Sequence, residues 1–133
     1  MTPFGEKLRK LRAERQVTLK DMAAAVGVSA AYLSALEHGR RGRPSWYLTQ
    51  RIIAFFNIIW DEAEELVRLA NVSHPRMVVD TAGLSPAATA LANKMAEHMR
   101  ELQPGEIDAI GVIVEKAARR ARERRSTKRR VKG

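Results

Sequence analysis

The chain has 133 residues, of which 45% are hydrophobic and none is cysteine. This composition excludes a disulfide-stapled domain and wholesale disorder, because the apolar residues are numerous enough to form a core. The net charge of +9 is unevenly placed: +6 over residues 1–51 (ten Lys or Arg, four Asp or Glu), −6 over residues 52–115 (four and ten) and +9 over residues 116–133 (ten and one). Two basic segments therefore flank an acidic one, and both are candidates for contact with phosphate.

The start of the chain and its apolar runs bear on localisation. Glu6 and Lys7 follow Phe4 almost at once, so the N-terminus lacks the apolar centre of a signal peptide. The longest strongly apolar run, residues 52–60, is too short to cross a bilayer and contains Asn57. We therefore expect a soluble, cytoplasmic protein with no membrane partner.

The first predicted element is a helix over residues 3–15. Apolar Phe4, Leu8 and Leu11 recur at spacings of four and three residues, which is the spacing of one helix face. The arginines of this segment lie off that stripe, as expected for a helix with one buried side.

Two shorter helices are predicted next, separated by a glycine turn. Thr18 has the position of an N-cap, and the helix that it opens ends before Gly27, which tolerates the left-handed turn. Ser29 has the position of the next N-cap, and its helix ends at Gly39. Such a pair projects the exposed face of its second helix outward as a rod that fits the major groove of DNA.

Two further helices complete the first domain. Pro44 or Ser45 opens one of them and Asn57 is expected to end it, while the acidic run at residues 61–64 opens the other, which extends to residue 70. The aromatic side chains of this region are predicted to pack in the core rather than to stack on bases. They are Trp46, Tyr47, Phe55, Phe56 and Trp60.

The second half of the chain is predicted to be a connector, a helical hairpin and a tail. Residues 71–84 are rich in turn-forming residues and are interpreted as a connector that packs locally. Two amphipathic helices over residues 85–120 are broken at residues 103–105, which makes a hairpin. Residues 121–133 are predicted to be a disordered basic tail, which binds nucleic acid by releasing counterions.

The hairpin has apolar surface to bury. It either folds back on the N-terminal domain or pairs with a second copy of the chain, and we favour the second arrangement. The predicted dimerisation residues are Leu91, Met95, Met99, Ile107, Ile110 and Val114.

The segment from Thr18 to Glu37 carries the most specific signal. Its two short helices meet at Gly27, and the small residue Ala23 lies where they cross. Together with the stretch Leu36-Glu37-His38-Gly39-Arg40, it resembles the helix-turn-helix of the Cro/CI (XRE) family of bacterial and phage regulators. The resemblance covers residues 4–70. It implies a five-helix DNA-binding domain over residues 1–70. With the hairpin and the tail that follow this domain, the whole chain is expected to be all-α.

The resemblance also implies which residues meet double-stranded DNA. The start of the second short helix and its next turn supply the base contacts, the following loop lies along the DNA backbone, and the helix N-termini are phosphate sites. Three of the base-contact positions are alanine, which forms no bidentate hydrogen bond to a base, so DNA shape supplies part of the specificity. The predicted DNA-binding residues are Thr18, Ser29, Ala30, Ala31, Tyr32, Ser34, Ala35, His38, Arg40, Arg41 and Arg43.

We therefore expect a dimeric DNA-binding transcriptional regulator, either a repressor or an autoregulator. Two alternatives stay open: an antitoxin or antiactivator whose residues 85–120 bind a partner protein, and a non-specific nucleic-acid binder that depends on the basic tail. No catalytic motif and no cofactor site are predicted. His38, His74 and His98 lie far apart without ligand spacing, so no metal site is expected.

Overall fold

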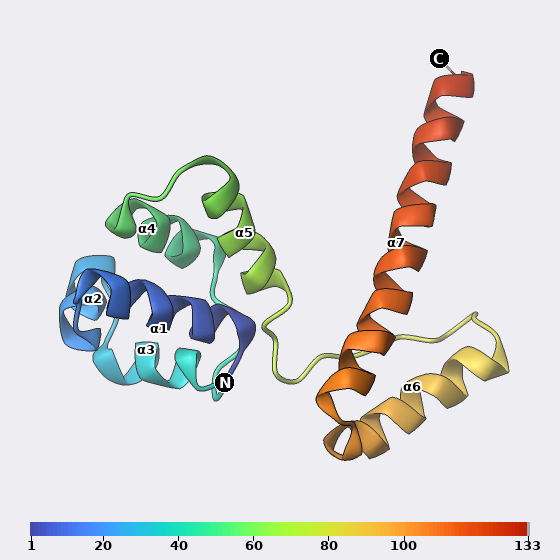
Figure 1. Cartoon of the computed structure of the whole chain (residues 1–133), viewed down its shortest axis with the longest axis horizontal. Helices are drawn as coiled ribbons and strands as arrows, with labels where there is room; N and C mark the ends of the chain where they lie inside the picture. The colour runs from blue at the N-terminus through green and yellow to red at the C-terminus, as the bar shows by residue number, and fades with distance from the viewer. Residues whose placement is uncertain (133) are drawn as a thin grey trace. The chain divides into compact units, whose positions relative to one another are not determined.

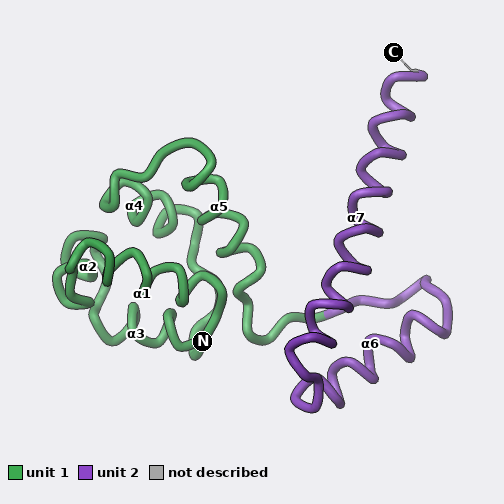
Figure 2. Tube along the Cα trace, viewed as in Figure 1, with its two compact units in different colours: residues 1–78 green, residues 79–133 purple. Residues whose placement is uncertain are grey.

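The computed structural model describes residues 1–132, which form helices and loops without a strand (Figure 1). The chain divides into two compact units, with the boundary between Val78 and Val79 (Figure 2). The helices of unit 1 are α1 (Pro3–Arg15), α2 (Leu19–Val26), α3 (Ala30–Glu37), α4 (Trp46–Phe56) and α5 (Trp60–Asn71). The helices of unit 2 are α6 (Pro86–His98), the short 3-10 helix η1 (Met99–Glu101) and α7 (Pro104–Lys132). The expected all-α fold, with five helices in its first part, is confirmed.

The core of unit 1 forms where its five helices meet. In Figure 1, α1 lies between α3 and α5, and it contacts both. Each helix turns one apolar face inward, because its apolar residues recur at helical spacing. The largest fully buried apolar side chains are Phe4, Leu8, Leu11, Met22, Val26, Leu33, Leu36, Ile52, Phe56 and Leu66.

A buried ion pair joins α1 to α3. Glu37 is 2% exposed, and its two carboxylate oxygens accept hydrogen bonds from Arg12 Nε at 3.0 Å and Arg12 Nη2 at 2.9 Å. The planar guanidinium matches the carboxylate in this bidentate geometry, and charge-assisted hydrogen bonds of this kind are stronger than neutral ones. The pair therefore holds the C-terminal end of α3 against α1.

The backbones of α1 and α3 approach each other closely at Gly5. A Cβ atom added to Gly5 would lie 2.1 Å from the carbonyl oxygen of Glu37, much closer than two such atoms can approach. Only glycine permits this packing, since any other residue would push the two helices apart. The sequence pattern does not mark this position, because the neighbour is 32 residues further along the chain.

The segment after α5 returns to the beginning of α1. The buried hydroxyl of Ser73 accepts a hydrogen bond from the Phe4 backbone N–H at 2.9 Å and donates one to the carbonyl oxygen of Leu69. The Phe4 N–H lies in the first turn of α1, where the backbone N–H groups have no hydrogen-bond partner within the helix. The predicted connector, residues 71–84, is thus divided between the units, and its first residues pack on unit 1.

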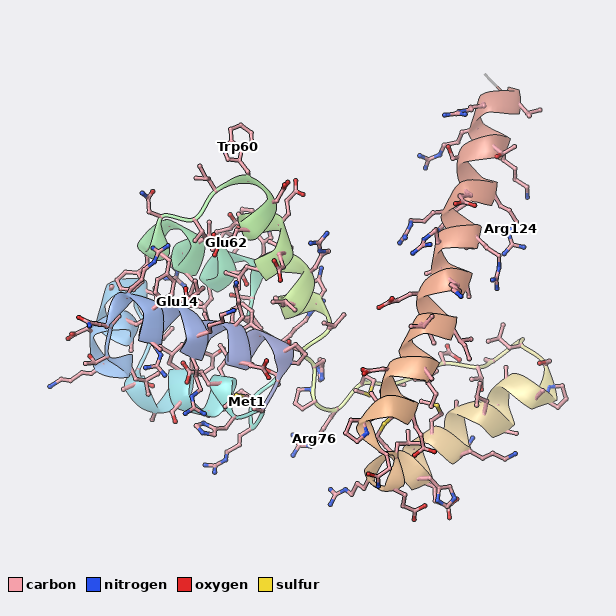
Figure 3. All side chains as sticks on the ribbon, in the orientation of Figure 1. Met1, Glu14, Trp60, Glu62, Arg76 and Arg124 are labelled. Carbon is pink, nitrogen blue, oxygen red and sulfur yellow. The ribbon has the colours of Figure 1, made fainter. Side chains whose placement is uncertain are left out.

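The predicted burial of the aromatic residues is wrong for three of the five. Phe56 is buried and Phe55 is half-buried, but Trp46, Tyr47 and Trp60 are 64%, 73% and 81% exposed. Trp46 and Tyr47 occupy the first turn of α4, away from the face that this helix buries. Trp60 begins α5 with a left-handed φ of 57°, and its side chain projects outward (Figure 3).

Unit 2 is an open arrangement of its helices. The predicted helices are present, but α6 and α7 diverge from the turn at η1 instead of running side by side (Figure 1). The reason is local, because Leu102 after η1 is extended, with a ψ of 133°, and redirects the chain before α7 begins. Neither α6 nor η1 buries a side chain, and Leu91, Met99 and Ile107 are exposed.

The basic C-terminal segment is helix rather than the predicted disordered tail. α7 continues through residue 121 to Lys132, and Gly133 of the predicted tail lies outside the described residues. The physical reason is composition: residues 112–132 lack glycine and proline and are rich in Ala, Arg, Glu and Lys, which have high helix propensity. Once a helix is nucleated, each residue that extends it adds one hydrogen bond.

No single helix of residues 1–132 is both long and apolar enough to cross a membrane. Only α2 and α3 taken together are long and apolar enough, and these two helices are bent by 109° relative to each other.

Candidate nucleic-acid interface

The turn between α2 and α3 has the geometry that the motif predicts. The two helices are bent by 109° relative to each other, within the range of helix-turn-helix units. Gly27 ends α2 in the left-handed region, with a φ of 78°, and its N–H donates to the carbonyl oxygen of Ala23. The next N–H, of Val28, donates to the same oxygen at 3.0 Å. Ala23 is buried at the crossing, where a larger side chain would separate the helices.

Both helices of the motif begin at a hydroxyl cap. Thr18 Oγ1 accepts the N–H of Asp21 at 3.0 Å, and Ser29 Oγ accepts the N–H of Tyr32 at 3.0 Å. Each cap satisfies one of the first-turn donors, and the remaining N–H groups have no partner within the helix. Because Thr18 and Ser29 are exposed, both helix N-termini are accessible to an anion such as phosphate.

The first turn of α3 presents small side chains to solvent. Ser29, Ala30 and Ala31 are exposed, whereas Leu33 and Leu36 hold the opposite side of the helix in the core. Because the two alanines at its beginning are small, the backbone of α3 can come close to a partner surface. It offers few hydrogen bonds there.

The next turn of the same helix is less accessible than its beginning. Tyr32, Ser34 and Ala35 are half-buried, and His38 just after the helix is exposed. His38 Nδ1 lies 2.8 Å from the carbonyl oxygen of Ser34. A carbonyl oxygen only accepts, so Nδ1 is assigned the proton, and Nε2 is the ring nitrogen that remains for an external partner.

The loop after α3 carries the predicted arginines, but the structure separates them. Arg40, Arg41 and Arg43 are all exposed. The guanidinium carbon of Arg41 lies 5.9 Å from the centre of the Tyr32 ring, which joins this arginine to α3 by a cation–π contact. Arg43 Nη1 instead donates to Asn71 Oδ1 at 3.3 Å, toward the end of α5. The structure thus brings Tyr32 and Arg41 together and sets Arg43 apart.

α4 has an exposed face next to the turn between α2 and α3, and the helix-turn-helix motif does not reveal it. Ser45, Tyr47, Gln50, Arg51 and Ala54 line a shallow hollow on this face. A guanidinium nitrogen of Arg51 lies 3.3 Å from the position that a Cβ on Gly27 would take, so α4 brings a cation to the helix-turn-helix turn. The spacing of residues 47, 51 and 54 opposite the buried face of α4 is the sequence signal that could have found them.

Comparison with known proteins agrees with this geometry. Residues 3–73 match a family described as "Helix-turn-helix domain", and this range contains α1 to α5 and Ser73. The chain is 52% identical over 44 residues to the HTH-type transcriptional repressor RghR of Bacillus subtilis, 33% of each chain. It is 34% identical over 61 residues to the uncharacterized HTH-type transcriptional regulator RghRB of the same organism, 46% of this chain and 44% of that protein. It is 45% identical over 53 residues to the HTH-type transcriptional regulator DdrOP3 of Deinococcus deserti, 40% of each chain.

The matched part of the chain spans less than half the length of each of these relatives. The family match is broader, because residues 3–73 make up more than half of the 133 residues. The matched range ends at Ser73, whose hydroxyl joins the segment after α5 to the beginning of α1. The chain therefore belongs to the helix-turn-helix domain family.

Proposed function

We propose that this protein is a sequence-specific regulator of transcription that binds double-stranded DNA through α3. The observation that carries the proposal is the helix-turn-helix itself, whose 109° bend leaves the first turn of α3 exposed beside an arginine-rich loop. An α-helix fits the major groove of B-form DNA, where the base edges are distinguishable. The matched relatives carry the names of transcriptional regulators, one of them a repressor, which supports the same role here.

The proposed contacts fall into two classes. Ser29, Ala30, Ala31 and Tyr32 face the bases, with the alanines against thymine methyl groups. Ser34, Ala35 and His38 lie one turn further along, at the edge of this surface. The backbone contacts come from Arg40, Arg41 and Arg43 and from the N-termini at Thr18 and Ser29. Because direct hydrogen bonds to bases are few, sequence-dependent DNA shape contributes to the choice of site.

The test of this proposal is selection of bound sequences from a random duplex pool, followed by titration of the selected site and of random DNA. We expect the selected site to bind at least about 10³-fold more tightly. Ala31→Glu places a carboxylate against the base edges, in the groove between the two phosphate backbones, and should abolish binding. Ala87→Glu on α6 adds the same charge and should preserve it. Equal affinity for selected and random duplexes, or unaffected binding by Ala31→Glu, would contradict the proposal.

We infer further that the protein acts as a homodimer through unit 2. Leu91, Met99, Ile107 and Val114 are exposed on α6, η1 and α7, while Met95 and Ile110 are half-buried. The open arrangement of α6 and α7 leaves these apolar side chains uncovered within the unit, and a second copy would cover them symmetrically. Two copies would also place two recognition helices on two half-sites.

Sedimentation velocity of the full chain tests the dimer. We expect a dimer that Ile107→Glu with Val114→Glu converts to a monomer, while Glu97→Gln on the exposed side of α6 leaves it intact. A native chain that sediments as a monomer would contradict the homodimer. It would favour the alternative in which residues 85–120 bind a partner protein, as in an antitoxin or antiactivator.

A further inference from the structure

The C-terminal half of α7, a helix of unit 2, concentrates positive charge. Residues 104–115 contain three acidic residues and no basic one, whereas residues 116–131 contain nine Lys or Arg and a single Glu, for a net charge of +8. All side chains of residues 116–131 are exposed except Ala121, which is half-buried. Across the described residues, the ion pairs include none of these nine cations.

Six of the nine cations form two sets on different sides of the helix. One set, the first cationic face, lines a shallow hollow with Ser126. The other set, the second cationic face, lines a separate hollow with Thr127 and Glu123. The first cationic face is Arg122, Arg125 and Arg129, and the second cationic face is Arg120, Arg124 and Lys128. Successive residues of an α-helix are about 100° apart, which places the centres of these sets about 130° apart. Figure 3 shows Arg124 projecting from α7.

This distribution of charge fits a groove better than a flat surface. A helix that binds at a membrane surface needs an apolar side to bury among the lipids. In residues 116–131 the apolar residues are three alanines and Val131, and they are interspersed with Arg124, Arg125 and Lys128 around the helix. A helix in a duplex groove instead meets phosphates on both walls, so cations on two different sides of the helix both find partners.

We propose that residues 116–131 of α7 are a second nucleic-acid-binding element, which binds the phosphates on both walls of a duplex groove without regard to base sequence. The choice of DNA as that duplex rests on the proposed function, because binding of DNA by unit 1 raises the effective concentration of DNA near α7. The element itself rests on its own charge and helical geometry.

The same charges predict a measurable change in α7 on binding. Arg120 and Arg124, Arg124 and Lys128, and Arg125 and Arg129 are like-charged pairs four residues apart, which destabilise a helix. Phosphates along both sides neutralise this repulsion. Helical ellipticity at 222 nm should therefore rise when duplex DNA is added.

The experiment uses the full chain and a random-sequence DNA duplex of about 30 base pairs, titrated between about 50 and 200 mM salt. One variant removes the first cationic face (Arg122→Gln, Arg125→Gln, Arg129→Gln), and another removes the second (Arg120→Gln, Arg124→Gln, Lys128→Gln). Glutamine has nearly the helix propensity of Arg and Lys, and circular dichroism checks that each variant is helical. The control removes three exposed cations outside α7: Arg76→Gln, Lys94→Gln and Arg100→Gln.

Each face variant is expected to flatten the plot of log affinity against log salt by about 0.9 per lost contact, or about 2.7 for three. The control variant, with the same loss of net charge, should keep the slope of the native chain. Slopes for both face variants equal to that of the control would overturn the proposal. Loss confined to one face would overturn the two-walled groove.

Two further ligands distinguish the sources of phosphate. Vesicles of phosphatidylserine and phosphatidylcholine should bind the native chain more weakly than the DNA duplex does at the same salt and phosphate concentration. An RNA duplex of the same length should bind more weakly than DNA. Vesicle binding tighter than that of the DNA duplex would overturn the assignment to nucleic acid. Tighter binding of the RNA duplex would overturn the choice of DNA.

The proposal for α7 and the proposed function can fail independently. If the native chain fails to discriminate a selected site from random DNA, the proposed function fails, but the slopes of the face variants still test α7. If discrimination is intact and the face variants match the control, only the second element fails.

Discussion

Replacing Glu37 by glutamine should destabilise unit 1 far more than the loss of a surface ion pair. Glutamine keeps the size of the side chain but removes its charge, and it turns an amide donor toward a guanidinium that also only donates. Arg12 then retains a charge without a counter-ion, while its side chain is only 18% exposed. The perturbation therefore isolates the electrostatic part of the contact between α1 and α3.

The magnitude follows from the two hydrogen bonds, at 3.0 Å and 2.9 Å, that the carboxylate accepts. Breaking a buried ion pair by removing one partner costs about 3–5 kcal/mol. We expect about 3 kcal/mol, at the low end of that range, because the partly exposed Arg12 reaches some water. For a domain of the size of unit 1, this corresponds to a fall in Tm of about 12–24 °C.

The assay is thermal unfolding of the full chain followed by tryptophan fluorescence. Trp46 and Trp60 are the two tryptophans of the sequence, and both belong to unit 1. The matched control is Lys7→Gln, which removes an ion pair of 3.8 Å to Glu62 whose side chains are 20% and 44% exposed. Such a pair contributes up to about 1 kcal/mol. The reasoning is refuted if Glu37→Gln lowers Tm no more than Lys7→Gln does.

Three further predictions concern packing, capping and phosphate contact. Gly5→Ala places a Cβ 2.1 Å from the Glu37 carbonyl oxygen, so it should lower the free energy of unfolding, measured by chemical denaturation, by at least about 1–3 kcal/mol. Gly111→Ala has open space around its Cβ and should instead stabilise α7 by about 0.5–1 kcal/mol. A smaller cost for Gly5→Ala would show that the helices shift apart easily. Ser73→Ala should leave the Phe4 N–H without its partner and cost about 1–3 kcal/mol, and rapid amide hydrogen exchange at Phe4 would accompany it; unchanged exchange would contradict this role. Arg40→Gln with Arg41→Gln should lower the salt dependence of DNA binding by about 0.9 per contact without changing the preferred sequence, and a changed preference would instead assign them to bases.

The elements that are coded locally could be read from the sequence alone. The bounds of α1, the caps at Thr18 and Ser29 and the turn at Gly27 each depend on residues within a few positions of one another. A hydroxyl that caps the N–H three residues later, or a glycine in the left-handed region, makes the same local interaction in any fold. The helix-turn-helix and the exposed tip of α3 follow from such signals.

The features that depend on distant neighbours were decided by the tertiary structure. Nothing near Gly5 in the sequence indicates that Glu37 will pack on it, and the Ser73 hydroxyl reaches Phe4 across 69 positions. The site is affected in the same way, because Arg43 is drawn to Asn71.

The packing of unit 1 as a whole decided which aromatic side chains are exposed. The helix that precedes the basic segment decided that this segment continues as helix. Trp46, Tyr47 and Trp60 are hydrophobic enough for a core, but the faces of α4 and α5 were already filled by other side chains. The basic segment after residue 121 has the composition of a solvated tail, yet it extends a helix already nucleated from Pro104. Hydrophobicity states what a side chain prefers, and only the packing of the other helices determines whether there is room for it.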